Sequence, residues 1–67
     1  MIIKPKDFHW DLEIRVRKKK GAQWQGPICG FYSTNITPEG YAIKSEREIG
    51  SVQIFPYAAL ELVPDGE

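Results

Sequence analysis

Few side chains in this chain are equipped for nucleophilic, acid–base or metal chemistry. The 67 residues include one histidine, His9, and one cysteine, Cys29. Two such ligands cannot complete a four-ligand structural zinc site, and a single cysteine cannot form an intrachain disulfide. No histidine partner for Cys29 is evident, so this thiol is predicted to be a small apolar residue and not a nucleophile. The sequence thus predicts no metal site and leaves neutral polar and basic side chains as candidates.

The most informative candidates lie between Ser51 and Phe55, where polar and apolar residues alternate. A period of two predicts a strand. Val52 and Ile54 are expected on its inward face. The outward face then carries Ser51, Gln53 and Phe55. An outward glutamine is normally just solvated, but a phenylalanine beside it makes this face partly apolar, as at a subunit interface or a ligand site.

Basic residues cluster near the start of the chain, and acidic residues gather from residue 39 onward. The basic cluster consists of Arg15, Arg17, Lys18, Lys19 and Lys20. Nine basic and nine acidic residues cancel, and a net charge of zero argues against a dedicated nucleic-acid binder. Lys19 and Lys20 are interpreted as a solvated strand end.

The sequence carries no sign of a membrane or secreted protein. No apolar run approaches the length of a membrane span, and charged residues follow the first three positions without the apolar region of a signal peptide. A single cysteine fits a reducing compartment. A cytoplasmic location is therefore expected.

The small size of the chain predicts that it needs a partner subunit. A domain of about 60 residues buries only ~60% of the surface that its unfolded chain exposes, and such domains usually need disulfides, a metal or oligomerisation. Surplus aromatic side chains favour the same conclusion, because a core this small cannot enclose them all. They are Phe8, Trp10, Trp24, Phe31, Tyr32, Tyr41 and Tyr57.

Five short strands with Gly- and Pro-rich turns are expected to position the candidate residues. They are predicted at residues 12–18, 24–33, 41–45, 51–55 and 60–63, with a type I turn at 37–40 and a 3₁₀ turn at 57–59. Glycine and proline within 24–33 are expected to bend the second strand.

These elements predict an all-β fold: a small five-stranded SH3-like barrel that the last strand closes. The 3₁₀ turn before that strand favours this fold over the five-stranded OB-fold, which typically needs a longer chain. The chain is divided into an N-terminal arm (1–11), the barrel (12–63) and a frayed C-terminal tail (64–67).

Three blocks of sequence carry a family resemblance. They are RVRKKKGAQWQG at 15–26, NITPEGY at 35–41 and SVQIFPYAALE at 51–61. Together, in order and in register, they resemble the type II dihydrofolate reductases encoded on resistance plasmids. The resemblance extends without a gap from Arg15 to Glu61, about two-thirds of the chain.

This resemblance implies a homotetramer with 222 symmetry, in which four SH3-like barrels form one central pore. The implied activity is NADPH-dependent reduction of dihydrofolate, insensitive to trimethoprim and without a side-chain general acid. The implied catalytic residues are Gln53, Ile54 and Phe55, and the implied binding residues for dihydrofolate and NADPH are Lys18, Ser51, Val52, Gln53, Ile54 and Phe55. Lys18 would lie at the pore mouth and attract the anionic ligands.

The chain departs from the family pattern at three positions. Phe55 replaces a tyrosine, Phe31 replaces a tryptophan, and Glu48 replaces a histidine that helps to join dimers. The arm also differs from the family's longer, disordered N-terminus, because its apolar residues are candidates for packing against the barrel. These are Ile2, Ile3, Phe8 and Trp10.

Two alternatives to the enzyme stay open, because SH3-like barrels host many functions. One is a non-enzymatic module that binds a peptide or nucleic acid. The other is a reductase-like protein with another native role. Gln53 discriminates between an enzyme and a binding module: replacing it by alanine is expected to impair the enzyme and to leave a binding module nearly unaffected.

Overall fold

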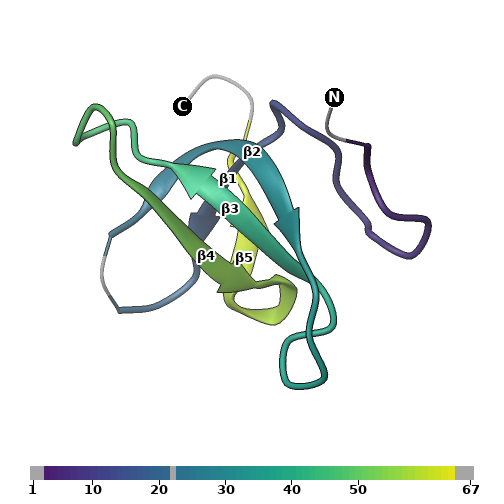
Figure 1. Ribbon diagram of the computed structural model, residues 1–67. Helices are drawn as coiled ribbons and strands as arrows, with labels where there is room; N and C mark the ends of the chain where they lie inside the picture. Colours follow the sequence, from purple (N-terminus) through teal and green to yellow (C-terminus); the bar gives the residue numbers. More distant parts are fainter. Residues whose placement is uncertain (1–2, 22, 65–67) are drawn as a thin grey trace.

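The computed structural model describes residues 3–21 and 23–64, which form one antiparallel five-stranded sheet (Figure 1). The elements are β1 (Arg15–Lys18), β2 (Gln25–Tyr32), β3 (Gly40–Lys44), β4 (Val52–Pro56), the 3₁₀ turn η1 (Tyr57–Ala59) and β5 (Leu60–Leu62). The strand order is β4-β3-β2-β1-β5. The predicted all-β class, the five strands and the 3₁₀ turn before the last strand are confirmed. No helix in the described ranges is long and apolar enough to cross a membrane.

The sheet curls around its core but is not closed. Strands β4 and β5 form its two edges, and η1 connects them (Figure 1). Strand β5 pairs with β1 over three positions, for example Lys18 with Leu60. The expectation that residues 60–63 would close the barrel is therefore wrong, because this short strand pairs with β1 alone and leaves β4 as an open edge.

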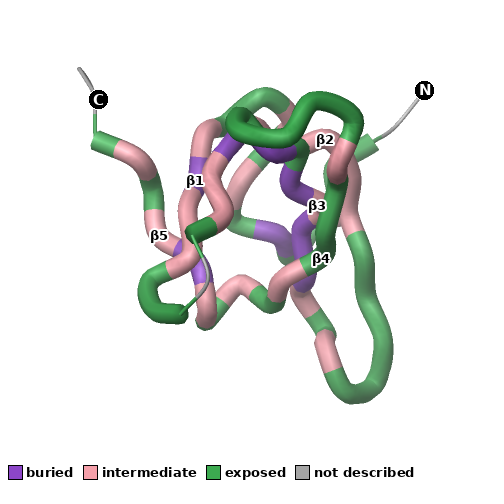
Figure 2. Tube along the Cα trace, turned by 90° about the vertical axis from the view of Figure 1, so that its left-hand side faces the viewer, coloured by how far each residue is buried: buried purple, intermediate pink, exposed green. Residues whose placement is uncertain are grey.

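The core lies inside the curl. Val16, Ile28, Tyr41 and Ile43 are fully inaccessible to solvent, and Leu60 and Phe8 are almost so. Figure 2 shows the buried positions in purple on the strands that surround this interior. Ile28 lies opposite Ile43 across the β2–β3 ladder, so cross-strand pairs on the inner face form the core. Tyr41 and Ile43 alternate with Ala42 along β3 and share this inner face.

Gly26 of β2 permits a close approach of the backbone at Lys44. A Cβ atom at Gly26 would lie 1.7 Å from the carbonyl oxygen of Lys44. The backbone N–H of Glu46 donates to the carbonyl of Gln25 at 3.0 Å beside this close approach. Further along β2 the ladder is irregular between residues 28 and 30, around the half-buried Cys29. The predicted interruptions thus bend one continuous strand.

The first strand starts later than predicted. Glu13 adopts a φ of 71°, a left-handed conformation that breaks regular strand geometry. Its N–H still donates to the carbonyl of Ile28, and the N–H of Ile28 donates to Ile14, so the pairing persists without a regular ladder. Ile14 is 38% exposed, whereas Leu12 packs against the core. The strand predicted at 12–18 is therefore regular only from Arg15 to Lys18.

The N-terminal arm is built into the core. The Phe8 ring meets the rings of Phe31 and Tyr41 edge-on, with centroid distances of 5.5 and 5.3 Å. Trp10 is half-buried against Tyr41, and Ile3 is exposed. The aromatic residues thus pack mostly within the chain, and Tyr32 is the exposed exception among those predicted as surplus. The expected packing of residue 2 and the tail at 65–67 lie outside the described residues.

Candidate active site

Strand β1 separates its basic side chains by face. Arg15 and Arg17 each form an ion pair with a carboxylate, at 2.7 Å to Glu46 and 2.7 Å to Glu61 respectively. Lys18 follows Arg17 and therefore points to the opposite face, the face of the buried Val16. Within residues 3–21 and 23–64, no carboxylate lies within ion-pair distance of Lys18. Its charge is thus not neutralised by an acidic neighbour.

The ammonium group of Lys18 lies over the ring of Phe55, 5.0 Å from the ring centroid. Lys18 belongs to β1 and Phe55 to β4, so this contact joins two strands that are not neighbours in the sheet. Trp24 meets the same ring edge-on, at a centroid distance of 6.0 Å. The Trp24 indole N–H donates to the carbonyl of Ile43 at 3.0 Å. Lys18, Trp24 and Phe55 therefore form one cluster, which we name the lysine–aromatic cluster.

A shallow concavity of about 490 Å³ opens beside this cluster. Its basic residues outnumber its single acidic residue, Glu46, which Arg15 pairs with. The basic residues that line it are Arg17, Lys18, Lys19, Lys20 and Arg47. This charge imbalance favours anionic ligands. Across the described residues, no group of three or more His, Cys, Asp or Glu side chains is arranged to hold a metal ion.

The faces of β4 are the reverse of those predicted. Gln53 lies opposite Ile43, and Phe55 lies opposite Tyr41, so these two residues share the inner face with buried partners. Val52 and Ile54 are each 48% exposed on the outer face. The inward assignment of Val52 and Ile54 is therefore wrong, because the register with β3 places the larger Phe55 ring against the core.

Gln53 remains exposed although it lies on the inner face, since β4 is the open edge of the sheet. Its side-chain amide has no hydrogen-bond partner within the described part of the chain. Ser51 precedes the strand and donates its hydroxyl to Glu48 at 3.2 Å. The structure thus joins Lys18 and Phe55 directly and places Gln53 on their face, whereas Val52 and Ile54 face away from them.

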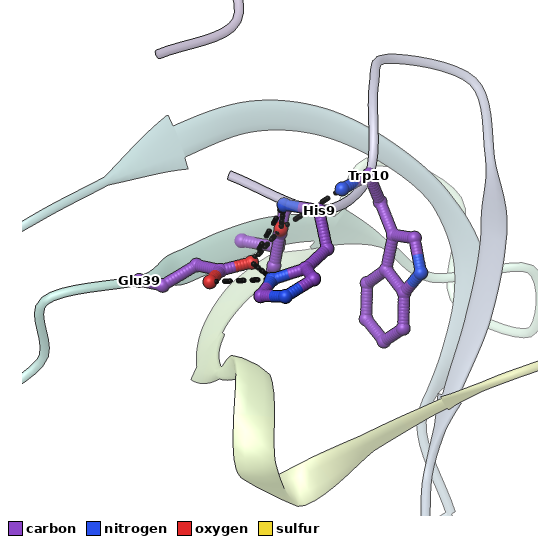
Figure 3. Close-up of polar contacts among 4 residues, drawn as sticks. His9, Trp10 and Glu39 are labelled. Atoms are coloured by element: carbon purple, nitrogen blue, oxygen red, sulfur yellow. Dashed lines mark hydrogen bonds and ion pairs between the residues drawn. The ribbon is translucent and has the colours of Figure 1, made fainter. Parts of the chain in front are cut away.

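Sequence reasoning did not single out a second cluster, formed by the arm and the 39–41 segment (Figure 3). The backbone N–H groups of His9 and Trp10 donate to the hydroxyl of Tyr41 at 3.0 and 3.1 Å. That hydroxyl donates in turn to Glu39 Oε2. His9 Nδ1 lies 2.9 Å from Glu39 Oε1, and the imidazole stacks on Tyr57 with a 4.3 Å centroid distance. The predicted turn at 37–40 contains Glu39, but the hydrogen-bond partners of Glu39 and Tyr41 include the distant arm.

Tyr41, Glu39 and Glu46 have perturbed pKa values. For Tyr41, burial and the hydrogen bond to Glu39 raise the pKa to about 12. For Glu39, burial raises the pKa, but hydrogen bonds from His9 and Tyr41 outweigh it, so the net pKa is lowered. Hydrogen bonds from Arg15 and Gln25 lower the pKa of Glu46 to about 2. Both carboxylates are therefore ionised and committed to structural partners near neutral pH.

Comparison with known proteins identifies the family. Residues 2–64 match the family model described as R67 dihydrofolate reductase. Two proteins of Escherichia coli, each named dihydrofolate reductase type 2, are 58% identical to this chain over 59 residues. The match covers 88% of this chain and 76% of each relative. With the family model matched over nearly the whole chain and identity at this level, the protein belongs to the R67 dihydrofolate reductase family.

Proposed function

We propose that four copies of this chain form an NADPH-dependent dihydrofolate reductase that trimethoprim does not inhibit. Family membership supports the reduction of dihydrofolate with a nicotinamide cofactor. The observation that carries the proposal is that two polar groups open to a ligand lie on one face. Within the described residues, the Lys18 ammonium has no carboxylate partner and the Gln53 amide has no hydrogen-bond partner.

These groups fit the chemistry of the two ligands. NADPH and dihydrofolate both carry anionic groups, which an unpaired ammonium attracts, and flat heteroaromatic rings with polar edges. Gln53 offers an amide plane with both donors and acceptors, while the exposed Val52 and Ile54 side chains lie on the other face of the strand. Ser51 and the backbone of Ile54 supply further polar atoms. A bound reduced nicotinamide supplies the hydride.

The proposed mechanism relies on binding and orientation. Lys18 is the single ionisable side chain among the six proposed site residues, so none of them is a carboxylic acid or an imidazole. Glu39 and Glu46 are ionised and engaged elsewhere. Protonated substrate would therefore be taken from solvent, and the site would hold the two rings in a reactive arrangement, which contributes up to ~7–11 kcal/mol in favourable cases.

The open edge of the sheet supports assembly with further copies. Strand β4 presents Val52 and Ile54 to solvent at 48% exposure each, next to unpaired backbone groups of an edge strand. Natural proteins rarely leave such an edge uncovered. We propose that other copies cover it in a homotetramer with 222 symmetry, so that the Gln53 residues meet around one pore. A cytoplasmic location, where Cys29 would stay reduced, is part of the proposal.

The decisive experiment measures NADPH oxidation by the purified chain with dihydrofolate, with and without trimethoprim, alongside light scattering for subunit number. We expect a tetramer, dihydrofolate-dependent activity and no inhibition by trimethoprim. Gln53→Ala should reduce activity at least tenfold, whereas Asn35→Ala, which removes an exposed amide away from the concavity, serves as the matched control. An inactive dimer or monomer would overturn the proposal, and an unaffected Gln53→Ala variant would favour the binding module.

A further inference from the structure

Lys18 stands apart from the other basic residues of β1. Arg15 and Arg17 are each neutralised by a carboxylate at 2.7 Å. Lys18 instead contacts an aromatic ring, which holds a cation through its quadrupole without cancelling the net charge. An ammonium held in this way stays available to an anionic group that approaches from the solvent side.

The backbone of Lys18 is fixed, so the reach of its side chain is limited. Its N–H donates to the carbonyl of Trp24 at 3.0 Å, and it pairs with Leu60 of β5 on the other side. The side chain folds back along the following turn: a Cβ atom built on Gly21 would lie 3.7 Å from Lys18 Nζ. The backbone of Lys18 is thus fixed by its strand neighbours, and its ammonium group lies on the Phe55 ring.

Phe55 is in turn oriented by Trp24. The two rings meet at 61° with a 6.0 Å centroid distance, the edge-to-face arrangement that aromatic pairs prefer. The indole is held against β3, because its N–H donates to the carbonyl of Ile43. Ile43 lies directly opposite Gln53 in the β3–β4 ladder. One tryptophan therefore ties the position of the Lys18 support to the strand that carries Gln53.

We propose that Phe55 and Trp24 are positioning residues for Lys18. They hold its unneutralised ammonium against the inner face of β4, the face that also carries Gln53, and thereby set how strongly the site binds the anionic groups of NADPH. This inference rests on the proposed function, which it deepens. It also assigns a role to the phenylalanine at position 55: the ring itself is required, and a hydroxyl on it is not.

The first test observes the contact itself and needs no activity. A proton above an aromatic ring is shifted upfield, so NMR of the folded protein should show the Lys18 side-chain CH₂ signals upfield of those of Lys4, an exposed lysine of the arm. We expect Phe55→Leu to abolish the shift and Phe55→Tyr to keep it. Trp24→Phe, which removes the indole N–H, should reduce it. Unshifted Lys18 signals in the wild-type protein would overturn the proposal.

The second test asks whether Phe55 acts through Lys18, by a double-mutant cycle on NADPH affinity measured by calorimetry. Phe55→Leu should weaken binding by about two- to fivefold at low salt, the range expected for loss of one cation–π contact. In a Lys18→Met background the same change should have little further effect. The salt dependence of binding should flatten in both single variants and stay unchanged in Lys4→Met, the matched charge control. Additive losses in the double variant would overturn the positioning role.

The two tests separate this inference from the proposed function. If wild-type protein fails to bind NADPH, the proposed function falls, while the NMR shifts still decide whether Phe55 holds Lys18. If NADPH binds and the cycle is additive, the reductase stands and the positioning role falls. Urea unfolding of each variant excludes the trivial explanation, because a merely structural role would lower stability without altering the salt dependence.

Discussion

The backbone N–H of Trp10 donates to the phenolic oxygen of Tyr41, 31 residues further along the chain. The same oxygen accepts the N–H of His9, and Tyr41 itself is fully buried in the core. A single hydroxyl thus anchors the N-terminal arm to strand β3. The arm is therefore part of the folded domain and not an appendage to it.

Removal of the Tyr41 hydroxyl should weaken the attachment of the arm to β3. In Tyr41→Phe, the N–H of Trp10 loses its acceptor, whereas that of His9 keeps Glu39 as a second acceptor. Leaving a buried donor unpaired costs ~1–3 kcal/mol, and because the Trp10 N–H is partly buried we expect a loss near the lower end of that range in the free energy of unfolding. Urea denaturation at fixed protein concentration measures it. Tyr57→Phe is the control, and an equal loss in that variant would contradict the anchoring role.

The Phe8 side chain should be essential for folding. Phe→Ala in a core typically costs ~3–5 kcal/mol. A chain of this length is expected to have about 3–10 kcal/mol of stability in total. We therefore expect Phe8→Ala to be largely or partly unfolded at 37 °C by circular dichroism. Ile3→Ala, at a position that is 77% exposed, should unfold like the wild type, and a fully folded Phe8→Ala variant would refute the core role of the arm.

Gly26 should not tolerate a side chain. The Cβ of alanine would lie 1.7 Å from the Lys44 carbonyl oxygen, so the backbone must move. We expect a destabilisation at or above the ~3 kcal/mol upper end of ordinary overpacking. Thermal melts of Gly26→Ala and Gly30→Ala test this prediction. At Gly30 the new Cβ would meet only the Ala42 side chain at 3.4 Å, so that variant should retain most of its stability.

Stability should fall at acid pH through Glu46. Its pKa drops from 4.5 in the reference state to about 2 in the folded chain, chiefly because Arg15 hydrogen-bonds the carboxylate. A depressed folded pKa contributes stability that is present above pH 4.5 and lost as pH falls toward 2. Because the side chain is 35% exposed, solvent screening limits this loss to about 1 kcal/mol.

The variant Glu46→Gln should flatten this acid limb when unfolding free energies are compared between pH 5 and 2.5. Glu13→Gln alters an exposed carboxylate outside the ion pairs of the described chain, and it should leave the limb unchanged. A steep acid limb retained in Glu46→Gln would show that other carboxylates dominate, with Glu39 as the next candidate because its pKa is also lowered.

The rate of the proposed reductase should decrease as pH rises from 6 to 8. The proposed site lacks a carboxylic acid and an imidazole, so the proton must come from solvent through protonated substrate, whose fraction falls with pH. Initial rates at saturating NADPH across this range measure the effect. A rate that increases with pH would indicate a side-chain acid or base that the proposed mechanism omits.

Much of the local structure followed from sequence pattern. Sequence patterns located all five strands within a few residues, and the glycine and proline residues marked the turns, because the backbone preferences of these residues act locally. The blocks that contain Lys18 and Gln53 also identified the family. These inferences depend on residues that are close in sequence.

Tertiary structure alone decided which residues share a face and which segments meet. Alternation requires that Gln53 and Ile54 point in opposite directions, but it does not say which one faces the core when both faces of a strand carry apolar residues. The register of β4 with Tyr41 and Ile43 settled this in favour of Gln53 and Phe55, because it buries the larger ring.

The same reason explains the two contacts that sequence reasoning missed. Lys18 and Phe55 are 37 positions apart, and the Trp10 N–H meets the Tyr41 hydroxyl over 31 positions. No local preference encodes such pairs, since each forms only after the curled sheet has brought its strands and arm around one core. The sequence by itself determined the strands, the turns and the family, whereas the packing of the folded chain determined the lysine–aromatic cluster and the anchored arm.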